Sequence, residues 1–591
     1  MMGPVMDASM TRLRHWAAER LDETRIRMAR PGAQISLALL GLVTGVLAGG
    51  VIVLFRLLVE GTQREILPGA QAANFESLAA GGRFLLPLAA AVALAAMFRW
   101  FSRGVHTLGI PYVLERIDRH QGRIGLRAFL LQFFGAVLAI VGGHSVGREG
   151  PNVFLGAASG SLLGTRLGLP HNVIRTLVGC GTAAGIAASF NTPLAGVVFA
   201  LEVVMMEYTV SSFIPVILAA VSATMLSNAV FGNYPAFTLP SMEIASLWHL
   251  VPVAVLGVTA GALSAAFIGS VQLVTRRTTA WPIELRIILA GVSMGLFGLA
   301  LPEVMGIGYD TVSSAMHGQY TVLFLLLLLL GKLLATSCVI GLGVPGGTIG
   351  PTLFIGAMLG AAFGGLSGYL PLTPQNQVGL FALLGLGAMM AGSLQAPLAA
   401  LTAMLELTDH PGIILPGMLV VVISGLTASE VFGRESQFLT MLRASGLKIG
   451  LDPVSQALRR IGVASVMDRE LHQVGREISV GRARELLLTH ARFLLIGGEA
   501  GGQVLMPAAN LASYLETEAG EHPEETIDLL AIPAQRLQAA SIGLQANLQE
   551  AAELLAGDGV EALVVKRRSS AGADRVFGAL TPEMVERAYR H

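Results

Sequence analysis

Charged residues are scarce in this chain of 591 residues: Asp, Glu, Lys and Arg make up 13% of it, against about 25% in a typical soluble protein. So few charges could not cover a water-facing surface of this size, which excludes a wholly soluble globule. Hydrophobic residues, at 53%, exclude a disordered chain. The 39 basic and 39 acidic residues balance, which argues against a nucleic-acid binder, because such a protein needs a basic excess.

The few charges are unevenly distributed. The first 450 residues hold 45 of them, whereas the last 141 hold 33, an ordinary share for a soluble domain. No Asp, Glu, Lys, Arg or His occurs between Lys332 and Glu406. Because about 20 apolar residues span a bilayer as a helix, we predict a multi-pass membrane domain at 35–449 and a soluble tail at 450–591.

Cysteine is almost absent. Cys180 and Cys338 both lie inside apolar stretches, which predicts neither a disulfide framework nor a zinc site. The membrane part has no HExxH, no cysteine cluster and no GxSxG with a triad, so no enzyme and no cofactor is expected. A membrane-bound enzyme or sensor that signals through the tail is the alternative from another class.

Apolar segments occur along the whole membrane domain, and many are too short or too broken by Gly and Pro to cross a bilayer as regular helices. Irregular backbone at membrane depth is tolerated only where protein or a polar cavity surrounds it, and such breaks in corresponding halves indicate a transport site. We therefore predict an all-α fold of broken and tilted helices. The segments are 35–58, 84–100, 128–141, 153–167, 172–189, 194–206, 213–230, 250–268, 285–301, 321–340, 353–366, 378–390, 398–405 and 413–431.

The N-terminal arm, residues 1–34, is rich in Arg and has no apolar core of the signal-peptide type. By the positive-inside tendency we predict a cytoplasmic arm, with a solvated helix of no topological role as the alternative.

An internal repeat relates two halves, about 35–232 and 247–446. Gly147–Pro151 (GREGP) and the apolar stretch after it return 200 positions later at Gly347–Pro351 (GTIGP). Asn191–Ala195 (NTPLA) likewise returns at Gln395–Ala399 (QAPLA). Two unrelated helix-packing stretches are the competing explanation.

Each copy is a Gly-x-x-Gly-Pro loop that leads into an apolar helix. A helix start offers unpaired N–H groups and the positive end of the helix dipole, which together favour an anion. If the repeats are inverted, both helix starts can point at one site near mid-membrane. A site made of main-chain groups also allows the ion to leave, as passage requires. A cation-coupled carrier would fit the repeat but not the anion-directed loops.

These segments resemble the CLC family of chloride channels and proton–chloride antiporters. The resemblance rests on Gly104–Pro111 (GVHTLGIP), Gly143–Pro151 (GHSVGREGP), Gly346–Pro351 (GGTIGP) and the helix that ends at Leu442. It implies a homodimer with one anion pathway per subunit, two inverted halves and a position in the cell membrane with both termini cytoplasmic.

The resemblance assigns Glu149 as the gating glutamate, whose carboxylate competes with an anion for one site. An ionisable residue inside a membrane is a functional hypothesis by default, and a helix-start acid stabilised by the dipole is the alternative. The neighbours Arg148 and Gly150 belong to the same anion-site segment, although Arg148 could also serve only to pair a loop charge.

Main-chain N–H groups at Thr348 and Ile349 match those that line the family's central anion site. Gly147 and Gly347 would shape the loops, with simple packing as the alternative. Two hydroxyls of the family's site are missing, because the Ser position holds Leu108 and the Tyr position holds Phe438. Phe438 could flank the site through its ring edge or be a plain core aromatic. Their loss predicts weaker coordination and altered selectivity among small inorganic anions.

Proton coupling is also in question. Family antiporters often carry a second glutamate where this chain has Val203, and an apolar side chain cannot carry a proton. Glu202 beside it has a repeat mate in Glu406, which suggests helix capping or dimer packing. We predict a voltage-gated-type chloride channel or uncoupled transporter; a proton-coupled antiporter that uses water, Glu202 or Glu207 is the alternative.

The tail resembles a CBS-domain pair, because residues 462–514 and 527–589 read as two copies of one strand-and-helix unit. In many such pairs a Thr and an Asp three residues later bind a nucleotide ribose. Here Thr581 is followed by Met584 at that place, which argues against adenine-nucleotide binding. A purely structural dimerisation module is the simpler interpretation.

Overall fold

The computed structural model describes residues 33–70, 72–105, 107–233, 250–367, 377–408, 410–447, 453–497, 503–517, 525–568 and 574–590, together with Glu23, Ile26 and Met28. Most of the predicted N-terminal arm and the predicted boundary near residue 450 lie outside these residues. The chain divides into two compact units. The larger comprises Gln34–Arg166 and Ile174–Gly450, and the other comprises Leu451–His591 with Met1–Ala33 and Leu167–Val173.

The described residues of the larger unit form helices and loops, without a β-strand. Its first half contains α2 (Gln34–Ile66), η1 (Pro68–Ala70), η2 (Phe75–Ser77), α3 (Ala80–Phe101), α4 (Ile110–Arg119), α5 (Leu126–Val141), α6 (Glu149–Arg166), α7 (His171–Phe190), α8 (Pro193–Phe199), η3 (Ala200–Met205) and α9 (Val210–Phe231).

Its second half contains α10 (Leu250–Thr278), α11 (Ile283–Ala300), η5 (Pro302–Val304), α12 (Tyr309–Met316), α13 (Val322–Gly341), α14 (Ile349–Ser367), α15 (Val378–Leu394), α16 (Pro397–Thr408), η6 (Pro411–Ile413), α17 (Ile414–Leu426) and η7 (Thr427–Val431), and α18 (Gln437–Ala444) follows.

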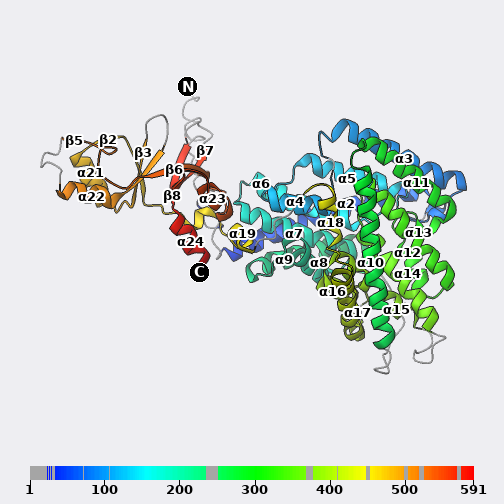
Figure 1. The fold of residues 1–591 in the computed structure, drawn as a ribbon. Coiled ribbons are helices and arrows are strands. Elements are labelled where there is room, and N and C mark those ends of the chain that lie inside the picture. Colours follow the sequence, from blue (N-terminus) through cyan, green and yellow to red (C-terminus); the bar gives the residue numbers. More distant parts are fainter. Residues whose placement is uncertain are drawn as a thin grey trace. The chain divides into compact units, whose positions relative to one another are not determined.

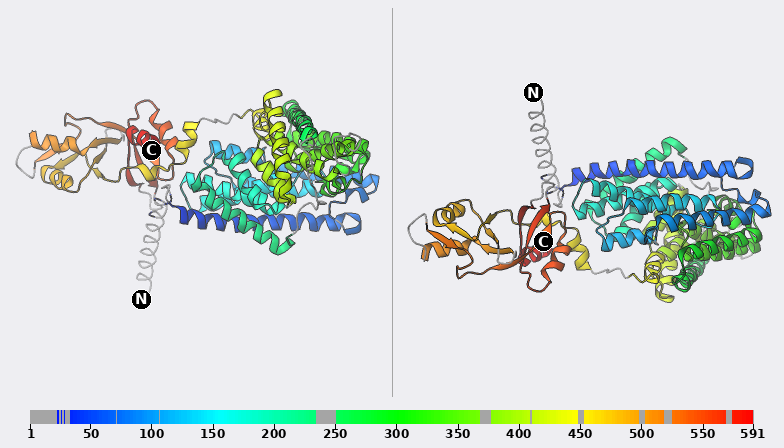
Figure 2. Two further views of the ribbon diagram at one scale, coloured as in Figure 1. Left: turned by 90° about the horizontal axis from the view of Figure 1, so that it is seen from below. Right: turned by 90° about the horizontal axis from the view of Figure 1, so that it is seen from above.

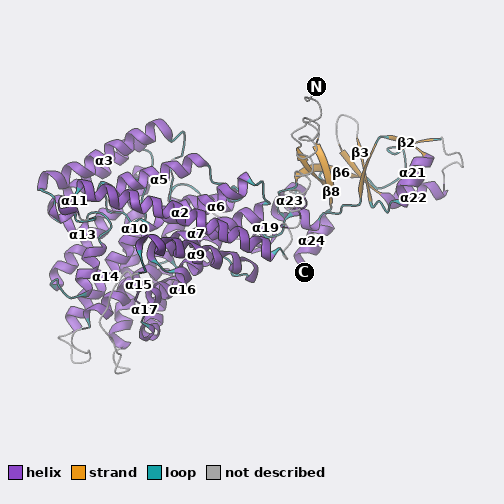
Figure 3. Cartoon of the chain, turned by 180° about the vertical axis from the view of Figure 1, so that it is seen from behind, coloured by secondary structure: helices purple, strands orange, loops and turns teal. Residues whose placement is uncertain are grey.

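The surface of this unit suits a lipid environment. Among the described residues, nine helices are long and apolar enough to cross a membrane. Large apolar side chains such as Leu39, Leu54, Leu323 and Met418 are exposed on the outer helices, where water would make them costly but lipid does not. Figure 2 shows α2, in blue, running along one edge of the unit, and α3 and α11 lie side by side in Figures 1 and 3. The prediction of a mainly helical membrane unit is confirmed.

The two halves repeat one order of helices. In each half two long helices precede a short helix, then a helix that ends before the Gly-x-x-Gly-Pro loop, and then a helix that packs against its successor. That packing is close: a Cβ on Gly156 of α6 would lie 2.0 Å from the carbonyl oxygen of Gly181, and one on Gly356 of α14 2.4 Å from that of Gly385. Glycine at these positions therefore allows α6 to pack on α7 and α14 on α15 with the helix backbones in contact.

The tail unit contains all the strands of the described chain (Figure 3). A six-stranded sheet has the order β1-β3-β4-β6-β7-β8, and β2 pairs with β5. The elements are α19 (Pro453–Arg459), α20 (Val463–Val466), β1 (Leu471–Val474), β2 (Glu477–Ser479), α21 (Val480–Leu488), β3 (Phe493–Gly497), β4 (Gln503–Pro507), α22 (Ala508–Thr517), β5 (Thr526–Asp528), β6 (Leu537–Gly543), α23 (Leu548–Leu555), β7 (Ala562–Arg568), β8 (Asp574–Leu580) and α24 (Pro582–Arg590).

The tail sheet repeats one pattern twice. β1 pairs in parallel with β3, which pairs antiparallel with β4; β6 pairs in parallel with β7, which pairs antiparallel with β8. A helix lies between the parallel strands in both copies, as parallel pairing requires a crossover. β4 and β6 join the copies into one sheet. The two strand-and-helix units predicted from the sequence therefore have matching topologies.

Candidate functional site

The two Gly-x-x-Gly-Pro loops meet directly. Gly147 N–H donates to the Gly347 carbonyl at 2.7 Å, and Gly347 N–H donates to the Gly147 carbonyl at 2.8 Å, which forms an isolated antiparallel bridge. A Cβ on Gly347 would lie 2.6 Å from the backbone nitrogen of Gly150. Glycine is needed here because no side chain fits between the loops. The bridge brings the starts of α6 and α14, one from each half, to one place.

Glu149, the first residue of α6, is fully buried at this junction. Its Oε2 accepts the backbone N–H of Gly350 at 3.1 Å, and its Oε1 accepts the hydroxyl hydrogen of Tyr309. Gly350 lies in the first turn of α14 and Tyr309 begins α12. The carboxylate from the first half thus occupies the helix start of the second half, which is a position suited to an anion.

The first turn of α14 holds the predicted main-chain donors. Thr348 and Ile349 are buried, and the Thr348 carbonyl accepts the N–H of Thr352 as α14 begins. The N–H groups at a helix start have no acceptors in a preceding turn. A Cβ on Gly147 or on Gly350 would lie 2.3 or 2.8 Å from Glu149 Oε2, so a glycine of each loop adjoins the carboxylate.

Arg148, next to Glu149 in the chain, lines a small cavity. Its Nη1 is 3.4 Å from Glu60 Oε1, and its guanidinium carbon is 5.7 Å from the centre of the Tyr309 ring. Arg56 pairs with the same Glu60 carboxylate at 2.6 Å. We name the adjoining space, of about 240 Å³, the Tyr309 cavity; Arg56, Arg148 and Tyr309 are among the residues that line it. Two arginines with one carboxylate leave this cavity with a positive lining.

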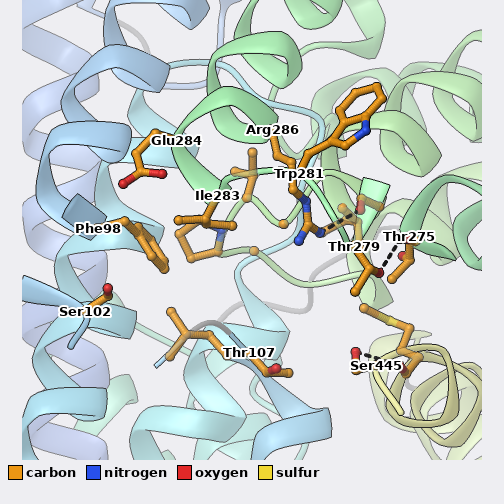
Figure 4. A pocket seen from close by; sticks show the side chains of 18 of the residues that line it. Phe98, Ser102, Thr107, Thr275, Thr279, Trp281, Ile283, Glu284, Arg286 and Ser445 are labelled. Atoms are coloured by element: carbon orange, nitrogen blue, oxygen red, sulfur yellow. Dashed lines mark hydrogen bonds between the residues drawn. The ribbon is translucent and has the colours of Figure 1, made fainter. Parts of the chain in front are cut away.

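Leu108 lines a second, larger cavity of about 550 Å³, which we name the Leu108 cavity. Gly346 and Met441 also line it, so it adjoins the loop before α14. Figure 4 shows Thr107 and Arg286 among its lining side chains. Arg286 Nη2 donates to the Gly341 carbonyl at 3.2 Å, whereas its buried Nε has no hydrogen-bond partner among the described residues. Arg286 is thus a cationic side chain of the cavity with unused hydrogen-bonding capacity; Arg99, which lies 3.7 Å from Glu284, also lines it.

Phe438, in the first turn of α18, is buried in the hydrophobic core, and α18 lines the Leu108 cavity through Met441. Next to it Gln437 is fully buried, and neither atom of its amide has a hydrogen-bond partner in the described part of the chain. An amide with unused hydrogen-bonding capacity therefore stands beside the position where the resemblance would place a hydroxyl.

Glu202 and Glu406 make reciprocal contacts across the two halves. Glu202, in η3, accepts the N–H groups of Leu398 at 3.2 Å and Ala399 at 2.8 Å, at the start of α16. Glu406, in α16, accepts those of Leu194 at 2.9 Å and Ala195 at 2.7 Å, at the start of α8. Each carboxylate therefore caps a helix of the other half. Val203 beside Glu202 is buried in the apolar core.

Two residues at the site, Tyr309 and Lys332, were not predicted from the sequence. Tyr309 lies outside the repeated motifs, and its partner Glu149 is 160 positions away. Lys332, fully buried, donates to three carbonyls just before Tyr309. The spacing of Lys332 was a possible sequence signal. Gln132, another polar residue within an apolar stretch, lies 200 positions earlier, which is the interval of the repeat.

The tail has a cavity of about 1,080 Å³ that both copies of the repeated unit line. Thr581 and Met584 are among its lining residues. A thioether at Met584 offers no carboxylate acceptor for a ribose hydroxyl. The hydroxyl of Thr581 interacts with Glu583, and this hydrogen bond lowers the pKa of that carboxyl.

Comparison with known proteins agrees with this architecture. The family model described as "Voltage gated chloride channel" matches residues 88–429, which is more than half of the chain. The helical membrane fold and this match together define the class of the protein as a channel or transporter. The chain belongs to the CLC family of voltage gated chloride channels, whose members move anions across membranes.

Two relatives are 30% or more identical to it over the aligned residues. The chain is 32% identical over 353 residues to "Putative chloride channel protein ClcB-like" of Ralstonia nicotianae; the aligned part covers 58% of this chain and 82% of that protein. It is 30% identical over 349 residues to "H(+)/Cl(-) exchange transporter ClcA" of Vibrio vulnificus, which covers 56% of this chain and 73% of that one.

Solved structures share the fold. A slow cyanobacterial Cl⁻/H⁺ antiporter superposes with a TM-score of 0.61 at 22% identity, over 70% of this chain and 97% of the other. A eukaryotic CLC transporter superposes with a TM-score of 0.60 at 19% identity, over 93% of this chain and 98% of the other. At these identities the likeness concerns the fold alone.

Proposed function

We propose that this chain conducts small inorganic anions, chloride among them, past the junction of α6 and α14, and that Glu149 is the gate. One observation carries the proposal: the buried Glu149 carboxylate accepts the N–H of Gly350 at the start of α14. A carboxylate in that position takes the place that a free anion would occupy.

Protonation of Glu149 opens the gate in this proposal. A neutral carboxyl gains nothing from the positive end of the α14 dipole, so an anion can displace it. The Leu108 cavity adjoins the loop before α14, and Tyr309, which contacts Glu149, lines the other cavity. Two cavities beside one narrow junction support a continuous route for a partly dehydrated ion.

Main-chain groups would do most of the coordination. Leu108 has no hydroxyl, and Phe438 lies in the core, so backbone N–H groups of Thr348 and Ile349 remain as the donors. Fewer hydroxyl donors weaken discrimination among anions of similar size, and we expect chloride to be carried along with other small anions.

We propose uncoupled anion movement over proton exchange, because Val203 cannot carry a proton and the Glu202 carboxylate is held by two helix N–H groups. Coupled exchange is the second candidate, since a relative is named as an H⁺/Cl⁻ exchange transporter. We further propose that the chain forms a homodimer in the cell membrane with cytoplasmic termini. We take the tail to be a CBS-domain pair that contributes to dimerisation and binds no adenine nucleotide, and we propose that the protein needs no cofactor.

Simultaneous chloride and proton flux from proteoliposomes tests these proposals. We expect chloride efflux that rises as the pH falls, with no protons driven uphill by a chloride gradient. Glu149→Gln should conduct at all pH values, whereas the control Glu406→Gln, which removes a carboxylate away from the junction, should keep the wild-type pH profile. Absence of anion efflux would refute the function, and uphill proton movement would establish the coupled alternative.

A further inference from the structure

Both oxygens of the Glu149 carboxylate are held by the second half of the chain. Gly350 N–H holds Oε2 and the Tyr309 hydroxyl holds Oε1. The first donor is a main-chain group that the start of α14 supplies whatever its side chains. The second is a side-chain hydroxyl, so it depends on the identity of residue 309.

The segment before Tyr309 is fixed by a buried cation. Lys332 Nζ donates to the carbonyls of Val304 at 3.1 Å, Gly306 at 2.7 Å and Ile307 at 3.3 Å. These three acceptors use all three hydrogens of the ammonium group. Gly306 N–H in turn donates to the Gly143 carbonyl at 3.0 Å, in the first half.

The first half starts the corresponding helix without either side chain, although the ψ of the preceding glycine is −161° there and 30° in the second half. Gly109, with a φ of 76°, precedes α4 just as Gly308, with a φ of 79°, precedes α12. The buried residue that holds the first segment is Gln132, whose Oε1 accepts the Gly109 N–H at 2.8 Å. The first residue of α4 is Ile110, which has no hydroxyl. A helix start at this place in the repeat therefore forms without a Lys or a Tyr.

We propose that Tyr309 retains the ionised Glu149 carboxylate in the anion site, and that Lys332 is a positioning residue that orients Tyr309 for this task. The inference rests on the proposed gating role of Glu149. A hydroxyl donor stabilises the ionised carboxylate and loses most of its strength when the group is protonated. Tyr309 thus sets the pH at which the gate is released.

Other charged groups share this environment. Arg148 lies beside the Tyr309 ring, with Glu60 and Arg56 behind it on α2. Asp310 follows Tyr309 on α12, and Lys332 approaches from α13. Phe at position 309 keeps the ring and leaves all of these charged side chains in place, so the substitution tests the bond from the Tyr309 hydroxyl to Glu149.

Tyr309→Phe in proteoliposomes tests the proposal. We expect the midpoint of the pH-dependent chloride efflux to move to higher pH by about one unit, which corresponds to about 1.4 kcal/mol and to about tenfold in the equilibrium between closed and open gates. Tyr112→Phe is the matched control, since Tyr112 is a buried tyrosine of α4 whose ring packs on Phe154. It should keep the wild-type midpoint.

A second set of variants separates this proposal from the gating role itself. If Glu149→Gln keeps the wild-type pH profile, the gating role fails. If Glu149→Gln abolishes the pH dependence but Tyr309→Phe leaves the midpoint in place, the gate stands and the role of Tyr309 is refuted. Adding Tyr309→Phe to Glu149→Gln should change nothing further, and a further change in efflux would place the tyrosine elsewhere in the pathway.

Lys332→Gln gives position 332 the residue of its repeat mate, Gln132, which keeps a buried hydrogen-bonding side chain. We expect a smaller shift in the same direction and no additional shift when Tyr309→Phe is already present. An equal shift in both backgrounds would overturn the positioning role. Lys332→Arg, which keeps the charge and the donors, should restore most of the wild-type midpoint.

Discussion

The Glu202 and Glu406 carboxylates are expected to stabilise the fold without carrying protons. Each accepts two backbone N–H groups at the start of a helix of the other half. Glutamine keeps one acceptor oxygen for two donors, so either substitution to Gln loses one charge-assisted bond. Such a bond contributes about 1.5–3 kcal/mol, and partial solvent exposure places the loss at the lower end. We expect a loss of about 1.5–2 kcal/mol in the free energy of unfolding from either variant.

The symmetry of the pair supplies the control. Thermal unfolding of the purified variants should give equal decreases for Glu202→Gln and Glu406→Gln. Proton and chloride movement in proteoliposomes should match the wild type in both. If Glu202→Gln changes proton movement while Glu406→Gln does not, Glu202 lies on a proton route and the capping account is incomplete. If neither variant is less stable, the capping bonds contribute nothing and the reasoning is wrong.

Three further predictions follow from the geometry. Gly347→Ala should abolish anion efflux, because its Cβ would lie 2.6 Å from a backbone nitrogen, while Gly425→Ala, where nothing lies within 4 Å, should conduct normally. Arg286→Gln should reduce efflux most at low ionic strength, where its charge in the Leu108 cavity is least screened, and Arg286→Lys should retain efflux. Glu76, in the loop between α2 and α3, has its pKa raised from 4.5 to about 7 by burial and neighbouring carboxylates, so the native state binds the extra proton and stability falls as the pH rises through this interval. Glu76→Gln should remove that fall in thermal unfolding measured from pH 4.5 to 8, and an unchanged pH dependence would contradict it.

The long helices could be predicted because hydrophobicity alone determines them. Each predicted apolar segment coincides with helix, although α2 continues past residue 58 to Ile66. The short helices α4 and α12 were missed, because each has fewer than eleven residues and mixes apolar with polar ones. The short α18 was expected only through the resemblance, as a helix that ends at Leu442, and it runs from Gln437 to Ala444. The helical form of all three depends on packing against the core, which a local pattern does not reveal.

The candidate site was also predictable only in part. The loops that carry Glu149 could be located because the same motif occurs twice, and helix starts favour anions whatever the surrounding residues. Tyr309 could not be located by the repeat, because the corresponding residue of the first half is Ile110, which has no hydroxyl. A contact between one half and a non-repeated residue of the other half is a tertiary contact, which no repeat in the sequence reveals.

The bridge between Gly147 and Gly347 has a consequence for how fast the proposed gate can open. Parting the two loops would break both of its hydrogen bonds and the close contact of Gly347 with Gly150. Rotation of the Glu149 side chain breaks only its bonds to Gly350 and Tyr309. The cheaper motion is therefore a change of rotamer within an immobile frame. Side-chain rotation is intrinsically faster than the microsecond-to-millisecond rocking of whole domains, so the proposed gate would open without a rearrangement of the backbone.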